Sequence, residues 1–298
     1  WSRNPPPGAG NVLYSDGRYR IETRTGDLAL IAVGGLYNTR TGAFEPLMMG
    51  VERYQFAVKG KTYQRDIQLD IPLDQTLTFK IPNRPLHPEG PDLYYIEPYL
   101  DFGLEGVFGQ LPDALGLRQL VRADGYPTLT GRLSDLSLDA YGGAYKRFNS
   151  RSLGPPQTVA LRQNVGSVTE TIGMPRLIGV PLKSTPSDYS TPRNGLIGFE
   201  RTAPAQPDIF RVQIYDRRGE VLWEAFIPGS STRVRLPTFP DFSDLPAHRR
   251  PDPYPPGTYS MRVTGIRHPN ASLDNFNFDE IAYYKLPAFA MTYDSIRF

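Results

Sequence analysis

The stretch that decides the fold is Asp208-Ile-Phe-Arg-Val-Gln-Ile-Tyr-Asp216, followed by Arg217-Arg218-Gly219 and then Val221-Leu-Trp-Glu-Ala-Phe-Ile227. Apolar and polar side chains alternate along its first segment, which is the period of a β-strand with one buried face. The last segment is rich in aliphatic and aromatic residues, and the triplet between the two segments suits a tight turn. The stretch therefore predicts an antiparallel β-hairpin.

Trp223 is predicted to lie in the core of the domain that this hairpin builds. It shares a strand face with Val221 and Ala225, two residues away on either side. One interpretation packs Trp223 between two sheets, and the other exposes it as a platform for a ligand. The first interpretation would place it against four residues of neighbouring strands: Phe210, Val212, Tyr259 and Val263. Tryptophan in a sandwich is more often buried, which favours the core.

Runs with the same period recur about every ten residues, which is typical of an antiparallel sandwich or barrel. The Asp16-Gly17 turn between two alternating runs predicts a hairpin over residues 11–23. The continuously apolar run Leu28–Val33 predicts a strand buried on both faces. Further strands are predicted over 51–59, with Tyr54, Phe56 and Val58 on one face, and over 62–71, 75–81, 93–101, 106–109, 130–148, 158–161, 231–236 and 257–266.

Three segments depart from this regular pattern. Residues 112–120 have the only helical pattern, with Asp113 as the N-cap and Gly116 weakening the helix. Pro98 places part of the strand 93–101 at an edge or a bulge, because proline has no N–H to donate. Residues 169–202 are interrupted by prolines and are expected to be irregular, so we place a domain boundary there.

Composition supports an all-β fold class. The 298 residues include 28 glycines and 30 prolines, together about a fifth of the chain against a usual share of roughly 12%. Aromatic residues make up 12% and hydrophobic residues 39%, which excludes a disordered chain. We therefore predict two antiparallel β-sandwich domains, Ig-like or fibronectin III-like, at 11–168 and 169–298, after a Pro/Gly-rich linker at 1–10.

Charge and cysteine content exclude several classes of protein. The formal net charge is +2, with both signs interspersed, which argues against nucleic acid as a partner. The absence of cysteine excludes disulfides, thiolate metal sites and cysteine nucleophiles. No apolar run approaches the roughly 20 residues of a membrane-spanning helix, so no transmembrane segment is expected.

The second predicted domain resembles the later half of a fibronectin type III-like or Ig-like sandwich. Several segments also resemble tandem β-sandwich modules of secreted or lipid-anchored envelope proteins of myxobacterial and other deltaproteobacterial type. The segments that carry this second resemblance are Gly60–Ile71, Tyr99–Gly103, Leu236–Pro240, Pro256–Tyr259, Ile266–Pro269 and Phe276–Phe278. The resemblance implies a cell-envelope or extracellular location and an anchoring or binding role. The lipid-attachment cysteine of such proteins is absent from this sequence.

The sequence contains no recognisable catalytic motif, and we predict that the protein is not an enzyme. The three histidines are His87, His248 and His268. They are far apart in sequence, which disfavours a histidine metal site. No nucleophile elbow, P-loop or dinucleotide fingerprint occurs. A carboxylate pair assembled across strands, such as Glu52 with Asp66 or Asp70, remains a third alternative, although charges on the outer face of a sheet are usually solvated.

Two groups of side chains are candidate binding sites. The first is an aromatic platform for sugars, formed by Tyr94, Tyr95, Tyr99, Tyr283 and Tyr284. The other interpretation places such tyrosines in the core of the sandwich. The second is a loop with oxygen ligands for calcium, at Asp274, Asn277, Asp279 and Glu280. Its spacing differs from that of an EF-hand. No other cofactor is expected.

These observations favour a non-catalytic structural or adhesion protein, located outside the cell or at the outer membrane of a bacterial envelope. It would bind other envelope or extracellular proteins through its sandwich surfaces, within a larger assembly. Tyrosine suits such contacts, because it buries a large surface and keeps a hydroxyl for a polar partner. The alternative is a carbohydrate-binding accessory module of a secreted enzyme, with a polysaccharide as its ligand.

Overall fold

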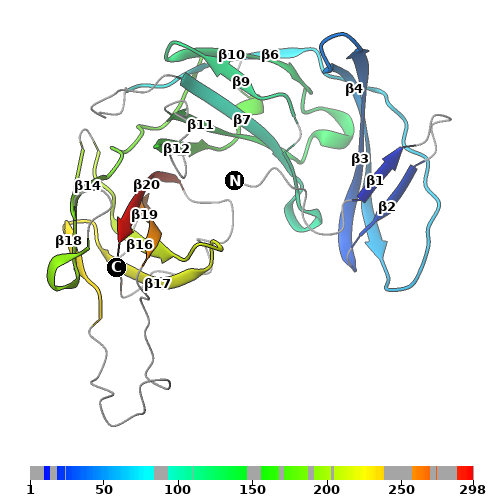
Figure 1. The fold of residues 1–298 in the computed structure, drawn as a ribbon. Helices are drawn as coiled ribbons and strands as arrows, with labels where there is room; N and C mark the ends of the chain where they lie inside the picture. The colour runs from blue at the N-terminus through cyan, green and yellow to red at the C-terminus, as the bar shows by residue number, and fades with distance from the viewer. Residues whose placement is uncertain are drawn as a thin grey trace. The chain divides into compact units, whose positions relative to one another are not determined.

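The structure, a computed structural model, describes residues 10–13, 19–23, 25–83, 93–109, 111–145, 156–167, 171–186, 191–202, 205–237, 257–268, 273 and 287–297. Within these ranges the chain is almost entirely β (Figure 1), which confirms the predicted fold class. Helical residues in the same ranges form short 3-10 turns: η1 (Gly103–Glu105), η2 (Gly131–Leu133), η3 (Val165–Ser167) and η4 (Arg193–Gly195).

The largest sheet has nine strands, in the order β17-β16-β19-β20-β12-β11-β7-β8, with β9 also paired to β7. Their bounds are β7 (Leu93–Asp101), β8 (Val107–Phe108), β9 (Ala114–Gly116), β11 (Ser137–Tyr145), β12 (Gln157–Arg162), β16 (Ile209–Tyr215), β17 (Val221–Pro228), β19 (Thr258–Arg267) and β20 (Ala288–Arg297). The antiparallel pairing of β16 with β17 confirms the predicted hairpin. Pro98 lies on β7 between the residues that pair with β9 and those that pair with β8.

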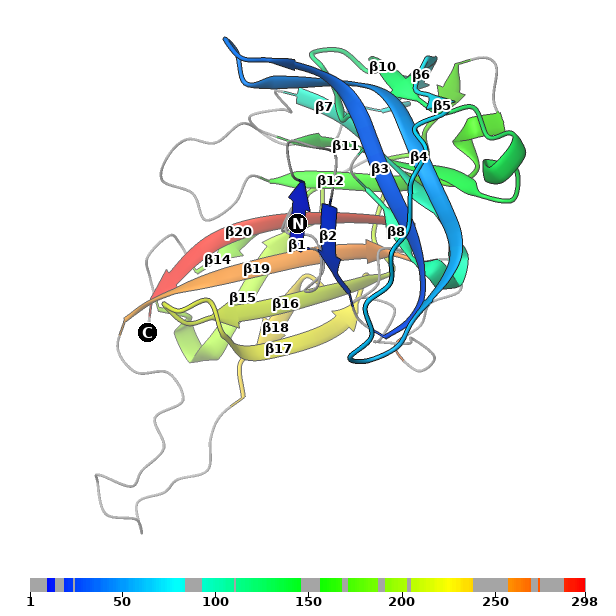
Figure 2. The same ribbon diagram turned by 90° about the vertical axis from the view of Figure 1, so that its right-hand side faces the viewer.

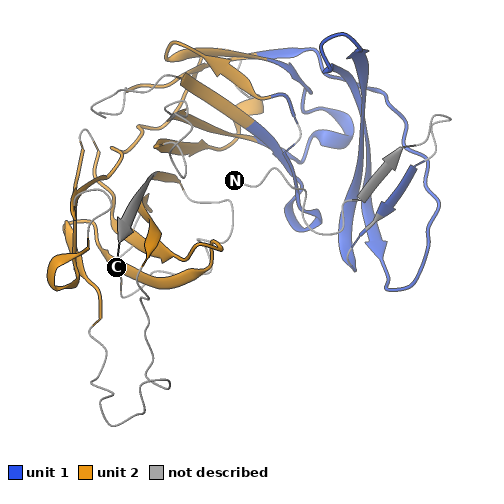
Figure 3. Ribbon diagram, viewed as in Figure 1, with its two compact units in different colours: residues 1–76, 98–112, 124–138 blue, residues 77–97, 113–123, 139–298 orange. Residues whose placement is uncertain are grey.

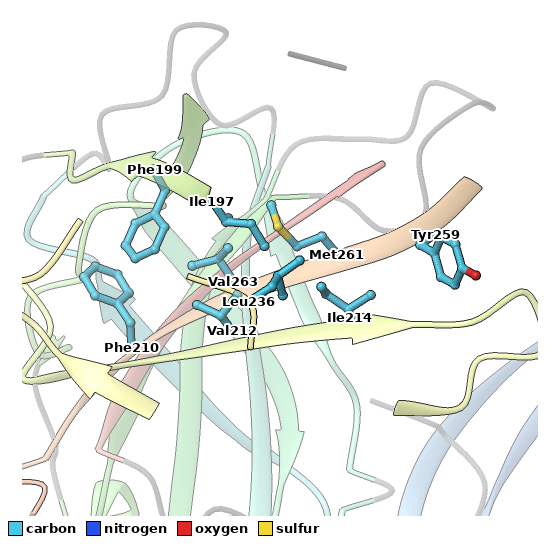
Figure 4. Close-up of a cluster of buried hydrophobic side chains, with 9 residues drawn as sticks. All are labelled: Ile197, Phe199, Phe210, Val212, Ile214, Leu236, Tyr259, Met261 and Val263. Atoms are coloured by element: carbon cyan, nitrogen blue, oxygen red, sulfur yellow. The ribbon is translucent and has the colours of Figure 1, made fainter. Parts of the chain in front are cut away.

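A smaller sheet packs against β16 and β19 and completes a β-sandwich. Its order is β14-β15-β18, with bounds β14 (Leu182–Thr185), β15 (Leu196–Glu200) and β18 (Arg233–Arg235). Buried side chains of the two sheets form one cluster (Figure 4): Ile197, Phe199, Phe210, Val212, Ile214, Leu236, Tyr259, Met261 and Val263. Phe199 and Phe210 meet edge to face, with ring centroids 4.7 Å apart. Removal of this apolar surface from water stabilises the sandwich.

Trp223 packs against this cluster, as predicted. It lies directly opposite Ile214 in the β16–β17 ladder, so its side chain is on the core face of the sheet. It is half-buried because β17 is the outermost strand. The core interpretation of Trp223 is confirmed.

A three-stranded sheet, β10-β6-β13, forms a further layer. Its strands are β6 (Gln75–Lys80), β10 (Leu120–Tyr126) and β13 (Ile172–Gly173), and β13 runs parallel to β6. Met174, directly after β13, lies over Gly142 of β11. A Cβ atom at position 142 would lie 2.6 Å from Met174 Cε, so the Met174 side chain approaches the backbone of β11 closely at this glycine.

The chain divides into two compact units (Figure 3). Unit 1 comprises residues 1–76, 98–112 and 124–138, and unit 2 comprises residues 77–97, 113–123 and 139–298. This division differs from the predicted domains at 11–168 and 169–298. The predicted boundary falls inside the large sheet, because β12 pairs with β20 from Gln157–Met291 to Ala160–Ala288. Of the predicted linker, residues 1–9 lie outside the described residues.

Unit 1 contains a small hairpin of β1 (Gly10–Leu13) and β2 (Tyr19–Glu22), as predicted, and the sheet β3-β4-β5. The strands of this sheet are β3 (Gly26–Asn38), β4 (Ala43–Ala57) and β5 (Ile71–Pro72). Figure 2 shows β3 and β4 running side by side over their whole length. We refer to residues 26–57 as the hairpin arm.

The strand predicted over residues 62–71 is wrong, since residues 61–70 are not in a strand and only Ile71 and Pro72 pair with β4. The segment instead lies over the hairpin arm at two glycines. A Cβ atom at Gly34 would lie 2.6 Å from Leu69 Cδ1, and one at Gly50 would lie 2.3 Å from Gln68 O. The alternation in sequence is therefore not accompanied by a ladder of backbone hydrogen bonds here.

Three other expectations need correction. The helix predicted over residues 112–120 is absent, because β9 pairs with β7 there and this tertiary pairing outweighs a weak helical pattern. Residues 28–33 are half-buried and not buried on both faces, since β3 lies at the edge of its sheet. Residues 169–202, expected to be irregular, include β13, β14 and β15. Their prolines lie outside these three strands.

Candidate protein-interaction surface

Exposed apolar side chains gather on and beside the hairpin arm. Among the described residues, nine of the sixteen large apolar side chains that are exposed fall between positions 36 and 69. Seven of the nine form two groups. The Tyr54 patch consists of Tyr54, Phe56 and Val58, and the tip patch consists of Leu36, Tyr37, Phe44 and Leu47. Exposed apolar side chains that gather in one region mark interaction sites on soluble proteins.

The Tyr54 patch continues the apolar residues of β4 beyond the core. Met49 and Val51 are 0% and 1% exposed, whereas Tyr54, Phe56 and Val58 are 75%, 60% and 43% exposed. The alternation of the last three predicts one strand face, and such a face is usually packed. Apolar side chains are therefore buried at Val51 and exposed from Tyr54 onward, only three residues later.

A β-bulge in β4 sets the backbone conformation of Tyr54. The register of the β3–β4 ladder shifts between Leu28 and Leu30, so that Arg53 and Tyr54 together face one residue of β3. Tyr54 has a φ of 60°, in the left-handed region that residues with a Cβ rarely adopt. This conformation costs on the order of 1–2 kcal/mol, and it persists only where surrounding groups hold it.

Arg53 and two carboxylates hold the bulge. Arg53 Nε donates to Glu105 Oε2 at 2.6 Å, and Arg53 Nη1 donates to both carboxylate oxygens of Asp135, at 2.8 and 3.1 Å. The side chains of Arg53 and Glu105 are 9% and 6% exposed, so water screens their interaction little. The Tyr54 backbone N–H donates to Glu105 Oε1, and its hydroxyl donates to Asp135 Oδ2 at 3.3 Å.

The Tyr54 ring is packed by the guanidinium of its neighbour. Arg53 Cζ lies 4.6 Å from the centroid of the Tyr54 ring and 5.4 Å from the centroid of the Phe102 ring, within the range of cation–π contacts. The exposed ring is thus held in place before any partner arrives. Ordering it in advance lowers the conformational entropy lost on binding.

The same arginine keeps Asp135 ionised. Hydrogen bonds from Arg53 lower the pKa of the Asp135 carboxyl below its ordinary value, with a smaller contribution from the Tyr54 hydroxyl. A carboxylate held ionised by a cation is a poor proton donor near neutral pH. Asp135 is thus suited to holding the Arg53 guanidinium in position.

A second group of charges involves Arg132, in η2. Its guanidinium donates to Asp70 and, at 3.3 Å, to Val51 O, and it lies 3.8 Å from Glu52 Oε1. Glu52 and Asp70 are two of the carboxylates considered from sequence for an acid–base pair. In the structure they share one guanidinium, which joins β4 to the segment that precedes β5.

The tip patch surrounds a turn with defined hydrogen bonds. Asn38 Oδ1 accepts from the Arg40 N–H at 3.0 Å, and the Gly42 N–H donates to Asn38 O at 2.8 Å. Gly42 has a φ of 70°, which a residue with a Cβ rarely adopts. Tyr37 and Phe44 lie directly opposite each other in the ladder, so two aromatic side chains, 64% and 50% exposed, share one face.

The outer face of the C-terminal sandwich, by contrast, carries a network of charged and polar side chains. Glu224 Oε2 accepts from Arg211 Nη2 at 2.7 Å and from Gln213 Nε2 at 2.9 Å. Arg262 donates to Gln213 Oε1, and its guanidinium lies 5.1 Å from the centroid of the Tyr215 ring. These charged and polar groups bind one another across β16, β17 and β19.

Three of the five tyrosines of the predicted aromatic platform lie among the described residues, and none of the three is exposed. Tyr94 and Tyr95 are 6% and 7% exposed, so their rings are core residues, the other interpretation that the sequence left open. Tyr99, on the same strand, is half-buried. Tyr283 and Tyr284 lie outside the described residues.

The predicted calcium ligands also fall outside the described residues. They are Asp274, Asn277, Asp279 and Glu280. Within the part of the chain that the structure does describe, no group of three or more His, Asp or Glu side chains could hold a metal ion. The same part has no helix long and apolar enough to cross a membrane.

The sequence pattern does not mark the Tyr54 patch as a site. Its alternation places Tyr54, Phe56 and Val58 on one face but gives no sign that this face is exposed. The carboxylates that hold Arg53 are 52 and 82 residues away along the chain, so no local motif reveals them. The one local sign of the site is the consecutive pair of Arg53 and Tyr54 within a strand that is otherwise rich in apolar residues.

Comparisons with known proteins add little to this geometry. No protein-family model matches the chain, and no curated protein matches it. A structural similarity covers 88% of this chain and 94% of the FN1-FN3 domains of chicken CNTN1, with 11% sequence identity and a TM-score of 0.20. At this TM-score the likeness carries no argument about fold or function.

Proposed function

We propose that the protein is a non-catalytic module that binds another protein through the Tyr54 patch. The observation that carries the proposal is an exposed tyrosine held in a left-handed conformation by a buried ion pair. Strained residues of this kind concentrate at functional sites. Tyrosine is also among the residues that contribute most of the energy at protein interfaces.

The side chains beside Tyr54 fit the same function. Phe56 and Val58 supply apolar surface, while Asp135, whose side chain is 56% exposed, supplies a charged group at the margin. An apolar centre with a polar rim is the usual anatomy of a protein interface. The pairing of carboxylates with Arg53 and Arg132 supports a structural use of these charges.

We further propose a structural or adhesion role in a bacterial envelope or the extracellular space. The support is the resemblance of strand and turn segments, such as Gly60–Ile71, to sandwich modules of envelope proteins. Gln68 and Leu69 of that segment lie over Gly50 and Gly34 of the hairpin arm, the element that also carries Tyr54 and Phe56. Partners of the protein would then be other envelope or extracellular proteins.

Site-specific photocrosslinking tests the proposal in cells of the source organism. A benzoylphenylalanine residue replaces Phe56 in the patch, and as a matched control it replaces Leu222, which is 43% exposed on β17. We expect a discrete protein adduct from position 56 and not from position 222, and Tyr54→Ser in the same chain should reduce its yield. The same adducts from both positions, or an adduct that Tyr54→Ser leaves unchanged, would contradict the proposal.

A glycan array with the purified protein tests the carbohydrate alternative. Protein binding through the Tyr54 patch predicts no glycan signal that depends on this patch. Binding of a polysaccharide that Tyr54→Ser abolishes would replace the proposed function with the accessory-module interpretation.

A further inference from the structure

The strand β3 forms a long edge of its sheet in the part of the chain that the structure describes. It spans Gly26–Asn38 and pairs with β4 on one side, and no strand among the described residues pairs with its other side. Figure 2 shows β3 beside β4 along this length. An edge strand presents a row of N–H and C=O groups to which another strand can add.

The sequence of β3 lacks the features that usually protect an edge. From Leu28 to Asn38 it contains no charged residue and no proline. Its side chains from Leu28 to Val33 are only half-buried, on both faces of the sheet. A long apolar edge strand without charges favours pairing with a further strand.

The other edge strands among the described residues are short or carry charge. Three of them, β5, β8 and β13, have two residues each. Two more, β1 and β9, have four and three residues. The charged or proline-bearing ones are β2 with Arg20 and Glu22, β10 with Arg122 and Asp124, β14 with Lys183, β17 with Glu224 and Pro228, and β18 with Arg233 and Arg235. The edge of β3 is therefore an exception within this molecule and needs an explanation of its own.

We propose that β3 pairs in antiparallel fashion with β3 of a second copy of the chain, about a two-fold axis at Val33. A two-fold interface uses the same surface of both copies, and an antiparallel strand pair satisfies this condition. It would join the two β3-β4-β5 sheets into one continuous sheet and cover the backbone edge of each. Val33 of one copy then lies opposite Val33 of the other.

Charge and side-chain size agree with this register. Asp27 at one end of β3 comes opposite Thr39 of the other copy, next in sequence to Arg40 in the turn that follows β3, and the two-fold axis repeats this arrangement at the opposite end. Ile31 comes opposite Gly35, so that a large side chain faces a residue without a side chain. A parallel pair would instead bring identical charges together at each end, which is unfavourable.

The proposed dimer uses a different surface from the proposed function. The function uses the side chains of Tyr54, Phe56 and Val58, whereas the dimer uses the backbone edge of β3. Either proposal can fail without the other.

Disulfide crosslinking tests the position of the axis. The chain has no cysteine, so Val33→Cys introduces a single thiol that opposes itself in the dimer. We expect a disulfide-linked dimer under mild oxidation, because directly opposed Cβ atoms are about 4.5–5.5 Å apart and a small shift of the strands brings them within the roughly 4.5 Å that a disulfide spans. Leu222→Cys, on an exposed strand of the other unit, is the control and should give little dimer. Equal crosslinking of both variants, or none from Val33→Cys, would overturn the proposal.

Sedimentation equilibrium of Leu36→Lys and Leu47→Lys tests the edge itself. Both leucines are exposed, but Leu36 is on β3 and Leu47 is on β4. A lysine on the edge strand should weaken the dimer at least about tenfold, whereas the matched lysine on β4 should change it less than about twofold. A wild-type protein that is monomeric at concentrations on the order of 100 μM, or equal effects of the two lysines, would overturn the proposal.

One further pair of measurements keeps the two proposals distinguishable. Tyr54→Ser should remain dimeric although it loses the photocrosslinked partner. Leu36→Lys should keep the adduct from position 56 although its dimer is weakened. Loss of both properties in either variant would contradict the assignment of separate surfaces.

Discussion

The C-terminal sandwich and the hairpin arm start from the same sequence pattern and use it differently. In the sandwich, Phe210 and Val212 alternate with polar residues and are 1% and 0% exposed, because β15 and β18 lie over them. In the hairpin arm, Tyr54 and Phe56 alternate in the same way and are 75% and 60% exposed. Alternation therefore specifies a strand with an apolar face, and a second layer is what buries that face.

The two regions also differ in what holds them in place. The sandwich core is an apolar cluster in which Phe199 and Phe210 meet edge to face. At the Tyr54 patch, the buried pair of Arg53 and Glu105 fixes the backbone. Dispersion and burial are non-directional, whereas hydrogen bonds to a guanidinium orient one side chain. The hairpin arm is thus suited to presenting a surface.

The largest expected effect is a difference in unfolding free energy between the same truncation, phenylalanine to alanine, made in each of the two regions. Phe210→Ala should lower the free energy of unfolding of the sandwich by about 3–5 kcal/mol, because it leaves a cavity in a packed core. Phe56→Ala should cost less than about 1 kcal/mol, because its ring is already in water. Thermal unfolding followed by Trp223 fluorescence, together with limited proteolysis, measures both. Similar losses would show that Phe56 is packed in solution.

The next effect separates the buried ion pair from the apolar core. Arg53→Ala should destabilise unit 1 by about 3 kcal/mol, because Glu105 is left buried without its cation. The double variant Arg53→Met with Glu105→Leu should recover most of this loss, since it removes both charges. Proteolysis of the hairpin arm with and without urea measures the difference. A double variant as unstable as Arg53→Ala would contradict the buried-charge explanation.

A smaller effect concerns the backbone conformation of the bulge, compared through the stabilities of glycine and alanine variants. Tyr54→Gly should be more stable than Tyr54→Ala by about 1 kcal/mol, because only glycine adopts a φ of 60° without strain. At Phe56, outside the bulge, the order should reverse, with alanine more stable than glycine by about 0.5–1 kcal/mol. Urea denaturation of the four variants gives both differences. The same order at both positions would show that the bulge relaxes in solution.

The smallest effect is a dependence on pH at Asp135, which binds Arg53 of the hairpin arm. The pKa of Asp135 is lowered in the folded protein by hydrogen bonds from Arg53, so its contribution to stability is complete above the ordinary carboxyl pKa of about 4. This contribution is lost as the pH falls through the lowered pKa. The difference in urea midpoint between wild type and Asp135→Asn should therefore shrink below about pH 4. A constant difference would show that Asp135 does not act through its charge.

Local patterns predicted the individual strands well where neighbouring strands lie close in sequence. The runs that became β16 and β17 alternate strictly and are joined by a tight turn, so their pairing is encoded within about twenty residues. Residues 62–71 alternate equally well but form no strand. Their carboxylate Asp70 and their apolar residues contact Arg132 and the hairpin arm, and no local pattern reports such contacts.

The amino-acid sequence by itself determined the all-β class, the strand periodicity and the absence of cysteine chemistry, because these depend on composition and on residues a few positions apart. The tertiary structure alone decided which apolar faces are covered. Gln157 pairs with Met291, and Arg53 binds Glu105 and Asp135, across separations that no local period encodes. Burial is a property of two surfaces brought together. Phe210 therefore became core and Tyr54 remained exposed.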